Sequence, residues 1–346
     1  MRILLIHQNF PGQFKQLGTH LVKQRGVQVI GIGEAENVKF KAQIPGLKVV
    51  TYPRRTAVAN NATHHYLRDY EKAIRRGQDV ARVCHSLRAR GFIPDLVVAH
   101  PAWGESLFIK DVFPSARLVN YFEYFYTAQG GDVNFDPEFP SSDDDLLRLR
   151  IKNSTNLQAL ASCDLGISPT QWQRSRYPQN FGPPIEVIHE GFDMGLYTHR
   201  PDAQFTLPNG HTLTRQSKVL TFVARNLEPY RGFHTVMRAL PRLLSLDPAL
   251  QVVMVGGDSV SYGSPPPAPH KTHRERMFAE CGVPDPTRVH FLGQLPYASF
   301  LDLLQVSPMA RSNSPTLGHP KFPQAGRSDY DDSGVMAMRA AASLRR

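Results

Sequence analysis

The sequence has little cysteine and no long apolar run. Its three cysteines, Cys84, Cys163 and Cys281, are far apart and show no C-x-x-C spacing. Their odd number and wide separation exclude a disulfide framework and favour a reducing compartment. No apolar run approaches the ~18 residues of a membrane span, and Ile3–Ile6 is too short for a secretory signal. These absences predict a soluble, cytoplasmic protein.

Acidic residues are also few relative to basic ones. The chain of 346 residues holds 40 Lys and Arg against 30 Asp and Glu, which gives a formal net charge of +10. A basic surface can serve nucleic acid, anionic lipid or a phosphorylated ligand, or simply keep the protein soluble. The charge alone selects none of these functions.

Short apolar segments alternate with longer helical patterns along the chain. The expected strands are Ile3–Ile6, Val27–Ile30, Lys48–Tyr52, Leu96–Ala99, Arg117–Tyr121, Leu165–Ile167, Ile185–Ile188, Val219–Val223, Val252–Val255 and Val289–Leu292. The expected helices are Phe14–Gln24, His65–Arg90, Glu105–Val112, Asp143–Cys163, Phe233–Ser245 and Lys271–Cys281. Apolar strands separated by helices indicate parallel sheets that are covered on both faces. The predicted fold class is α/β, with doubly wound, Rossmann-like domains.

Composition changes suggest how the chain divides. We predict an N-terminal domain over residues 1–194, a polar linker over 195–217 and a second domain over 218–307. Residues 308–346 contain too few large apolar side chains to form a buried parallel strand. They are predicted to be a disordered tail, which leaves the second domain incomplete with three strands.

The segment His65–Arg90 is the best-defined helix. Apolar and small residues recur at steps of three and four, and they predict one packing face made of Leu67, Tyr70, Ile74, Gly77, Ala81, Cys84 and Leu87. Its arginines lie mostly off this face, at Arg68, Arg75, Arg76, Arg82, Arg88 and Arg90. They form either a solvated face or a surface for anionic lipid or a charged acceptor.

Polar and small residues follow the carboxyl ends of the expected strands in both halves of the chain, where open α/β sheets bind ligands. They include Asn9, Gly12, His100, Glu190, Gly191, Arg225, Arg231, Gly257 and Asp258. Their common position predicts a cleft shared by the two domains.

The segment Arg225–Arg231 is the most informative of these. It runs from an expected strand into a helix that begins near Gly232 or Phe233. The free backbone N–H groups and the positive dipole end of a helix N-terminus favour an anion, and arginine binds phosphate through two parallel hydrogen bonds. The segment therefore resembles a diphosphate clamp. Alternatively, one arginine pairs structurally with Glu228.

Two further candidates are single residues. Gly12 would allow the backbone to approach a ligand closely, or it forms a plain turn after Pro11. His100 directly follows a strand, where a catalytic or ligand-binding imidazole would be placed, although an isolated histidine is more often structural. The remaining histidine and cysteine groups, His64-His65 and His270-x-x-His273 with Cys281, lack a convincing set of four metal ligands.

Together these features resemble the GT-B-fold glycosyltransferases of family 4. The resemblance covers about residues 1–307 and rests on His100–Glu105, the exit Ile188–Asp193, the Arg-x5-Arg-Gly sequence Arg225–Gly232, and the start His7–Phe14. It implies two Rossmann-like domains facing a cleft. It also implies transfer of a sugar from a nucleotide-diphosphate sugar to a saccharide or lipid-linked acceptor, usually with retention, in synthesis of cell-surface polysaccharide or glycoconjugate. No metal, other cofactor or nucleic acid partner is expected.

The resemblance also suggests residue roles. Arg225 and Arg231 match the family's basic pair on the donor diphosphate, Gly12 matches the loop near donor and acceptor, and His100 matches the histidine near the reacting sugar. Asn9, Glu190, Gly191, Gly257 and Asp258 are further cleft candidates. The family's pair of glutamates, separated by seven residues, is absent because Glu280 is the last glutamate. The tail from residue 308 resembles the product of a frameshift or an altered terminus.

Two other functions fit the same sequence. One is a catalytically inactive relic whose first domain binds an acceptor or an anionic surface, with the basic helix attaching it to the inner face of the membrane. The other is a nucleotide-sugar epimerase or hydrolase of the same fold.

Overall fold

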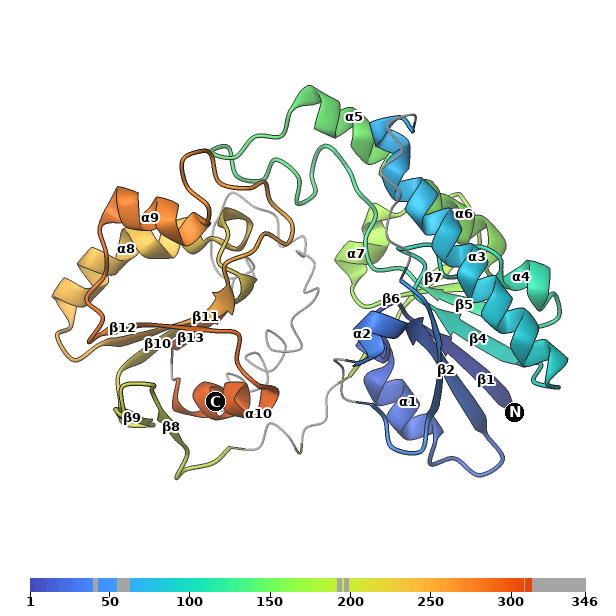
Figure 1. Ribbon diagram of the computed structural model, residues 1–346, viewed down its shortest axis with the longest axis horizontal. Helices are drawn as coiled ribbons and strands as arrows, with labels where there is room; N and C mark the ends of the chain where they lie inside the picture. The colour runs from blue at the N-terminus through green and yellow to red at the C-terminus, as the bar shows by residue number, and fades with distance from the viewer. Residues whose placement is uncertain (40–42, 55–62, 192–194, 196–198, 308, 313–346) are drawn as a thin grey trace. The chain divides into compact units, whose positions relative to one another are not determined.

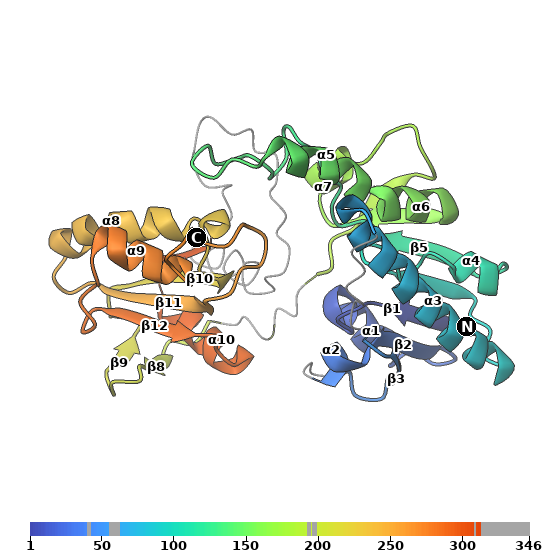
Figure 2. The same cartoon turned by 45° about the horizontal axis from the view of Figure 1, so that its top comes forward.

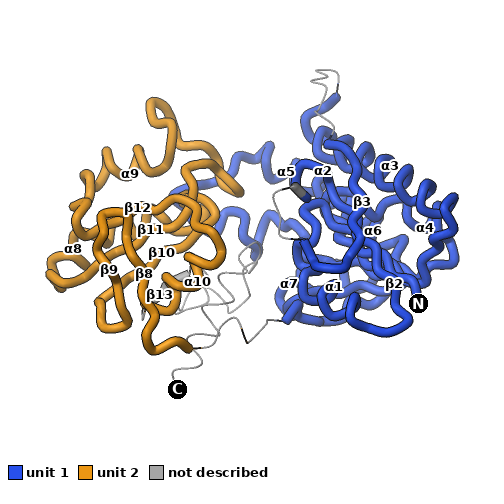
Figure 3. The backbone as a smooth tube through the Cα atoms, turned by 60° about the horizontal axis from the view of Figure 1, so that its bottom comes forward, with its two compact units in different colours: residues 1–192, 325–328 blue, residues 193–324, 329–346 orange. Residues whose placement is uncertain are grey.

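The computed structural model describes residues 1–39, 43–54, 63–191, 195, 199–307 and 309–312 (Figure 1). These residues fall into two compact units, with the boundary near residue 192 (Figure 3). Among the helices that are described, none combines the length and apolar character needed to cross a bilayer.

Unit 1 is built on a seven-stranded parallel sheet of order β3-β2-β1-β4-β5-β6-β7. Its strands are β1 (Arg2–Ile6), β2 (Gln28–Glu34), β3 (Lys48–Tyr52), β4 (Leu96–Ala99), β5 (Arg117–Tyr121), β6 (Leu165–Ser168) and β7 (Ile185–Val187). Its helices are η1 (Gly12–Phe14), α1 (Lys15–Leu21), α2 (Ala35–Lys39), η2 (His65–Leu67), α3 (Arg68–Ala89), α4 (Ile109–Val112), α5 (Asp143–Lys152), α6 (Ser154–Ser162) and α7 (Gln171–Arg176). Because all these strand pairs are parallel, the strands end at one common edge (Figure 2).

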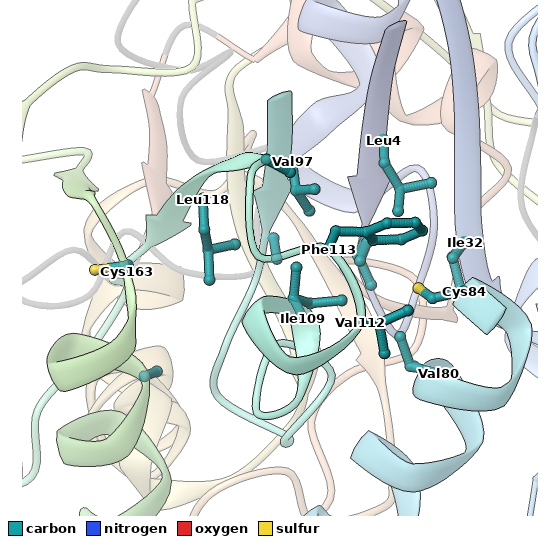
Figure 4. Close-up of a cluster of buried hydrophobic side chains, with 14 of the residues drawn as sticks. Leu4, Ile32, Val80, Cys84, Val97, Ile109, Val112, Phe113, Leu118 and Cys163 are labelled. Atoms are coloured by element: carbon teal, nitrogen blue, oxygen red, sulfur yellow. The ribbon is translucent and has the colours of Figure 1, made fainter. Parts of the chain in front are cut away.

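Both faces of this sheet are buried. Alternate residues of β1 point to opposite faces, so Leu4 and Ile6 join one apolar cluster while Ile3 and Leu5 join another. The first cluster packs against α3, α4 and α6, and Figure 4 shows part of it. The second packs against η1 and α1. The predicted doubly wound α/β class is confirmed.

Helix α3 crosses one face of the sheet. Ala73, Gly77, Val80, Cys84 and Leu87 are buried at steps of three and four, so the helix has the single packing face that its periodicity predicts. The predicted face is shifted at its start, where Leu67 is 45% exposed.

Unit 2 holds a four-stranded parallel sheet of order β12-β11-β10-β13 and a small hairpin. The sheet strands are β10 (Val219–Asn226), β11 (Gln251–Gly257), β12 (Val289–Gly293) and β13 (Met309–Ser312), and the hairpin strands are β8 (Gln204–Thr206) and β9 (Thr212–Thr214). The helices are η3 (Pro229–Arg231), α8 (Phe233–Leu246), α9 (His273–Cys281) and α10 (Tyr297–Val306).

The prediction of three strands in the second domain is wrong. β13 pairs in parallel with β10, with Leu220 opposite Met309 and Val223 opposite Ser312. A strand at the edge of a sheet is held by backbone hydrogen bonds along one side, so it does not require the apolar run that we looked for. The rest of the predicted tail, residues 313–346, lies outside the described residues.

The predicted linker over residues 195–217 is also not a simple connection. β8 and β9 pair antiparallel within it, and Phe205, Leu207 and Leu213 are buried. Pro208, Asn209 and Gly210, which indicated a linker, instead form the turn of the hairpin, where Gly210 has a φ of 84°. Turn-forming residues mark hairpins and linkers alike, which explains the error.

Candidate functional site

Two histidines meet at the common strand edge of unit 1. β1 and β4 are neighbours, with Ile6 opposite Ala99, and each histidine is the residue that follows. The rings of His7 and His100 therefore lie edge to face, with centroids 4.9 Å apart. His100 is fully buried and His7 is 2% exposed.

Backbone donors select the tautomer of both neutral rings. The N–H of Asn9 donates to His7 Nδ1 at 2.8 Å, and the N–H of Ala102 faces His100 Nδ1 at 3.4 Å. A ring nitrogen that accepts a hydrogen bond carries no proton, so the neutral form of each ring has its proton on Nε2. Both imidazoles therefore present an Nε2–H donor.

These donors converge on one carboxylate. His100 Nε2 lies 2.8 Å from Glu123 Oε2, and His7 Nε2 lies 2.6 Å from Gln13 Oε1. Gln13 links His7 to the same carboxylate, because its Nε2 donates to Glu123 Oε1 at 2.9 Å. We call His7, Gln13, His100 and Glu123 the histidine network. Sequence reasoning found only His100 among its members.

The members of the histidine network differ in exposure. Glu123 is 12% exposed, whereas the ring of His100 is enclosed and Trp103 stacks on it with centroids 4.6 Å apart. A ligand that approaches this edge can therefore reach Glu123, while His100 is positioned behind it.

The structure explains why position 12 is a glycine. Its φ is +49°, and a Cβ at this position would lie 2.5 Å from the ring of His7. The absence of a side chain thus allows the close approach of the imidazole. Its predicted role at a donor diphosphate stays a prediction.

Glu190 and Gly191 lie after β7. Tyr121, at the end of β5, donates its hydroxyl proton to Glu190 Oε1, and the N–H of Gly191 donates to His189 Nδ1 at 3.0 Å. Glu190 Oε2 is buried without a hydrogen-bond partner among the described residues and lies 3.8 Å from His189 Nε2. The structure thus brings Glu190 to the edge where β5 ends.

A second polar cluster lies beside the histidine network. Arg76 of α3 places its Nε 3.6 Å from an oxygen of Glu34 and 3.6 Å from Glu105 Oε1, and both carboxylates are buried. Tyr52 donates to the same Glu105 oxygen at 2.9 Å, and Arg76 donates to the carbonyl oxygen of Trp103 at 2.8 Å. We call Glu34, Tyr52, Arg76 and Glu105 the carboxylate network. It holds the loop that carries Trp103 and His100.

Burial raises the pKa of Glu105 to about 7, although Arg76 acts in the opposite direction. Desolvation disfavours the charged carboxylate, and Glu105 Oε2 has no hydrogen-bond partner among the described residues. Burial also raises the pKa of the Tyr52 hydroxyl, and the charge of Glu105 adds to this shift. The carboxylate network therefore binds a proton more tightly in the folded protein than in the unfolded chain.

A pH dependence of stability follows. Between the ordinary Glu value of 4.5 and about 7, the folded protein retains a proton that the unfolded chain has lost. The contribution of Glu105 is thus complete below pH ~4.5 and falls as the pH rises to ~7, by at most about 3 kcal/mol. Glu105→Gln, which imitates the protonated acid, should remove this loss. Urea unfolding from pH 4.5 to 8 measures it as the difference between wild type and variant.

The control for this experiment is Glu71→Gln on the exposed side of α3. Hydrogen bonds from Arg75 and Thr63 lower the pKa of Glu71, so its contribution should have the opposite sign and be lost as the pH falls. A wild-type minus Glu105→Gln difference that does not change with pH would contradict a protonated Glu105.

In unit 2, the two predicted arginines converge on one aromatic ring. The guanidinium carbon of Arg231 lies 4.8 Å from the ring centroid of Tyr262, and that of Arg225 lies 5.9 Å from it. Arg231 belongs to η3, and Gly232, with a φ of 75°, is the N-cap of α8, which begins at Phe233. The helix therefore starts where the sequence predicts.

Among the described residues, Glu228 forms no ion pair with Arg225 or Arg231, so the alternative prediction that one arginine pairs structurally with Glu228 is wrong. Its buried Oε2 accepts the backbone N–H groups of Ser261, Tyr262 and Gly263 at 3.0, 3.3 and 3.3 Å. Burial raises the pKa of Glu228, while these hydrogen bonds and the charge of Arg231 lower it. Its hydrogen bonds within the described residues hold the β11–α9 loop against the β10–α8 loop.

Gly257 and Asp258 lie on the same edge, at the end of β11. Gly257 is paired with Asn226, and a Cβ there would lie 2.7 Å from Asn226 Oδ1. Asp258 accepts a hydrogen bond from Arg274 Nε at 2.9 Å and forms an ion pair with it. The structure therefore brings Arg225, Arg231, Gly257 and Asp258 to the neighbouring carboxyl ends of β10 and β11, with Asp258 already paired.

Comparison with known proteins agrees with this architecture. Residues 25–196 match the family described as the Glycosyl transferase family 4 group. No curated protein sequence matches the chain.

Solved structures share the fold at low identity. Sucrose-phosphate synthase (tll1590) from Thermosynechococcus elongatus is 13% identical, with 89% of this chain and 74% of that chain covered and a TM-score of 0.55. The catalytic domain of starch synthase IV from Arabidopsis thaliana, bound to ADP and acarbose, is 15% identical, with 89% and 77% covered and a TM-score of 0.55. A trehalose-6-phosphate structure from E. coli, bound with UDP-2-fluoro glucose, is 12% identical, with 91% and 79% covered and a TM-score of 0.57. These likenesses show the GT-B fold of glycosyltransferases, and by its match over residues 25–196 the chain belongs to the glycosyl transferase family 4 group.

Proposed function

We propose that this glycosyltransferase uses a nucleotide-diphosphate sugar as its donor. The observation that carries the proposal is the pair of guanidiniums at the strand edge of unit 2, beside the first turn of α8. Arg231 Nε is buried and has no hydrogen-bond partner among the described residues. A buried, unsatisfied donor on a cation beside a helix N-terminus suits an anionic ligand.

The chemistry of such a transfer needs these groups. When the bond between the sugar and the diphosphate breaks, negative charge grows on the phosphate oxygen of the leaving nucleoside diphosphate. Two guanidiniums and the N–H groups of a helix N-terminus stabilise that charge more strongly in the transition state than in the ground state. We propose that they do so without a metal or another cofactor, and with retention at the sugar.

For unit 1, the proposed ligands are sugar hydroxyls. We propose that His100, the predicted catalytic residue, acts through Glu123, because its own ring is enclosed and its Nε2 lies 2.8 Å from that carboxylate. A carboxylate accepts hydroxyl donors well, and the partial exposure of Glu123, which Gln13 shares, allows a hydroxyl to meet it. Whether the acceptor is a free saccharide or a lipid-linked one stays a prediction, as does the shared cleft.

The structure favours a solvated face over lipid attachment for α3. Arg75 and Arg82 pair with acids of the same helix, and Arg76 is part of the carboxylate network. Among the described residues, the two arginines without an ion pair or hydrogen bond from their guanidiniums are Arg68 and Arg90, at opposite ends of the helix. Two separated cations do not make the basic patch that anionic lipid requires.

Thermal unfolding in the presence of UDP-, GDP- and ADP-sugars tests the proposal. One donor at 100 times its Kd should stabilise the protein by about 2.7 kcal/mol, since it binds only the folded state. The same sugars without a nucleotide should give no comparable shift at these concentrations. A cooperative transition that none of the donors raises would contradict the proposal and favour an inactive relic. Release of free or epimerised sugar without an acceptor would instead indicate a hydrolase or an epimerase.

A further inference from the structure

We infer that Tyr262 is a positioning residue for the two arginines, and that Glu228 holds it in place. This inference rests on the proposed function, because it assigns the arginines to a nucleoside diphosphate. It adds a requirement that the arginine pair by itself does not predict. The β11–α9 loop must present an aromatic ring to the guanidiniums before they can hold the diphosphate.

The geometry around Tyr262 carries the inference. Its ring stacks on Tyr230, with centroids 5.5 Å apart and planes inclined by 29°. The guanidinium of Arg231 lies over both rings, 4.8 Å from the centroid of Tyr262 and 5.9 Å from that of Tyr230. Tyr262 is 43% exposed, so its ring is only partly buried where it meets the guanidiniums.

The backbone of Tyr262 is held from the neighbouring loop. Glu228 is fully buried, and its Oε2 accepts the N–H groups of Tyr262 and of both its neighbours. Asn226, at the end of β10, adds a hydrogen bond from its Nδ2 to Ser261 Oγ at 2.6 Å. Since a buried carboxylate is stabilised by such donors, the loop cannot move away from Glu228 without leaving a charge unsatisfied.

An aromatic ring beside a guanidinium favours phosphate binding by restricting the arginine side chain. A guanidinium is planar, and a ring against its face leaves the N–H donors along its edge available for a phosphate oxygen. The side chain of arginine otherwise loses much rotational freedom when it binds. A ring that already restricts Arg231 lowers this entropic cost and therefore raises the affinity for the ligand.

Isothermal titration of the full chain with UDP, ADP and GDP, and with the corresponding nucleoside monophosphates, tests the inference. Tyr262→Leu removes the ring and should weaken binding of the preferred diphosphate by roughly 3- to 30-fold, the range of a cation–π contact. Tyr262→Phe keeps the ring and should bind like the wild type. Binding of the monophosphate should change less, since it engages fewer of the guanidinium donors.

Two further variants complete the experiment. Leu246→Ala removes an exposed apolar side chain of unit 2 at the C-terminal end of α8, away from the carboxyl ends of the strands, and should leave nucleotide binding unchanged. Glu228→Gln keeps an oxygen acceptor but loses the charge, and it should weaken diphosphate binding in the same direction as Tyr262→Leu. This second variant tests the inference through the backbone of the loop, while the ring itself is intact.

The outcomes separate the inference from the proposed function. Tyr262→Leu binding the diphosphate as tightly as the wild type, or more tightly, would overturn the inference while the proposed function stands. Equal losses for monophosphate and diphosphate would also overturn it, because the ring would then contact the nucleoside. A wild-type chain that binds none of the three diphosphates would remove the proposed function itself.

Discussion

Replacing Arg231 by alanine is expected to weaken binding of the nucleoside diphosphate by about a hundredfold or more. The guanidinium would donate two charge-assisted hydrogen bonds to phosphate, each worth about 1.5–3 kcal/mol. Arg231 Nε is buried and unsatisfied among the described residues, so the protein offers it no competing acceptor there. Titration calorimetry with the diphosphate identified by the thermal screen measures the loss.

The matched control is Arg242→Ala. Arg242 is an exposed residue of the same helix, α8, and its removal changes the net charge by the same amount. It should alter the affinity only slightly, because an exposed charge far from a ligand is screened by salt. If both variants lose affinity equally, the effect of Arg231 is one of overall charge, and the clamp is wrong.

Gly104→Ala is expected to destabilise unit 1 by about 3–5 kcal/mol. Gly104 has a φ of +103°, and a Cβ there would lie 2.2 Å from the backbone oxygen of Ala73 in α3. The strained backbone costs about 1–3 kcal/mol, and displacing a helix backbone costs a similar amount. On the opposite side of the contact, a Cβ on Gly77 would lie 2.7 Å from the Gly104 oxygen. Neither main chain can yield as a flexible side chain would.

Gly91→Ala separates the two causes. Gly91 also has a positive φ, +79°, but no heavy atom of the described residues lies within 4 Å of its added Cβ. It should cost about 1 kcal/mol, from backbone strain alone. The melting temperature should therefore fall by roughly 10 °C for Gly104→Ala but by only a few degrees for Gly91→Ala. Equal losses would show that the close contact with α3 contributes nothing.

Much of the fold could be predicted because parallel strands are buried on both faces. Each of the apolar segments that we expected to be a strand is one, within a few residues at its ends. Most of the elements that were missed lack this signal. α2 has five residues, α7 has six, β8 and β9 have three each, and β13 is an edge strand. Hydrophobic periodicity cannot detect elements that are so short or so little buried. α10 is the exception, because Phe300, Leu303 and Leu304 are buried at helical spacing and the segment was nevertheless not expected to be a helix.

The candidate site was predicted less completely. The rule that ligands lie beyond strand ends found His100, Gly12 and the arginines, because each follows an apolar segment. Glu123 lies two residues beyond β5 and so obeys the same rule, although it is not among the predicted site residues. The contact between Tyr262 and Arg231 could not be found this way. It depends on how a long loop folds back onto η3, and no local pattern encodes that path.

The contact between the two histidines also depends on the register of β1 and β4. His7 and His100 meet because each is the first residue beyond its strand, and because Ile6 and Ala99 are opposite each other. Side chains alternate between the faces of a sheet, so a slip of one residue in this pairing would turn the two rings to opposite faces. The contact between the rings therefore forms only in the correctly registered sheet. The His7–His100 contact thus distinguishes correct from shifted pairing of β1 and β4, two strands of unit 1 that are distant in sequence.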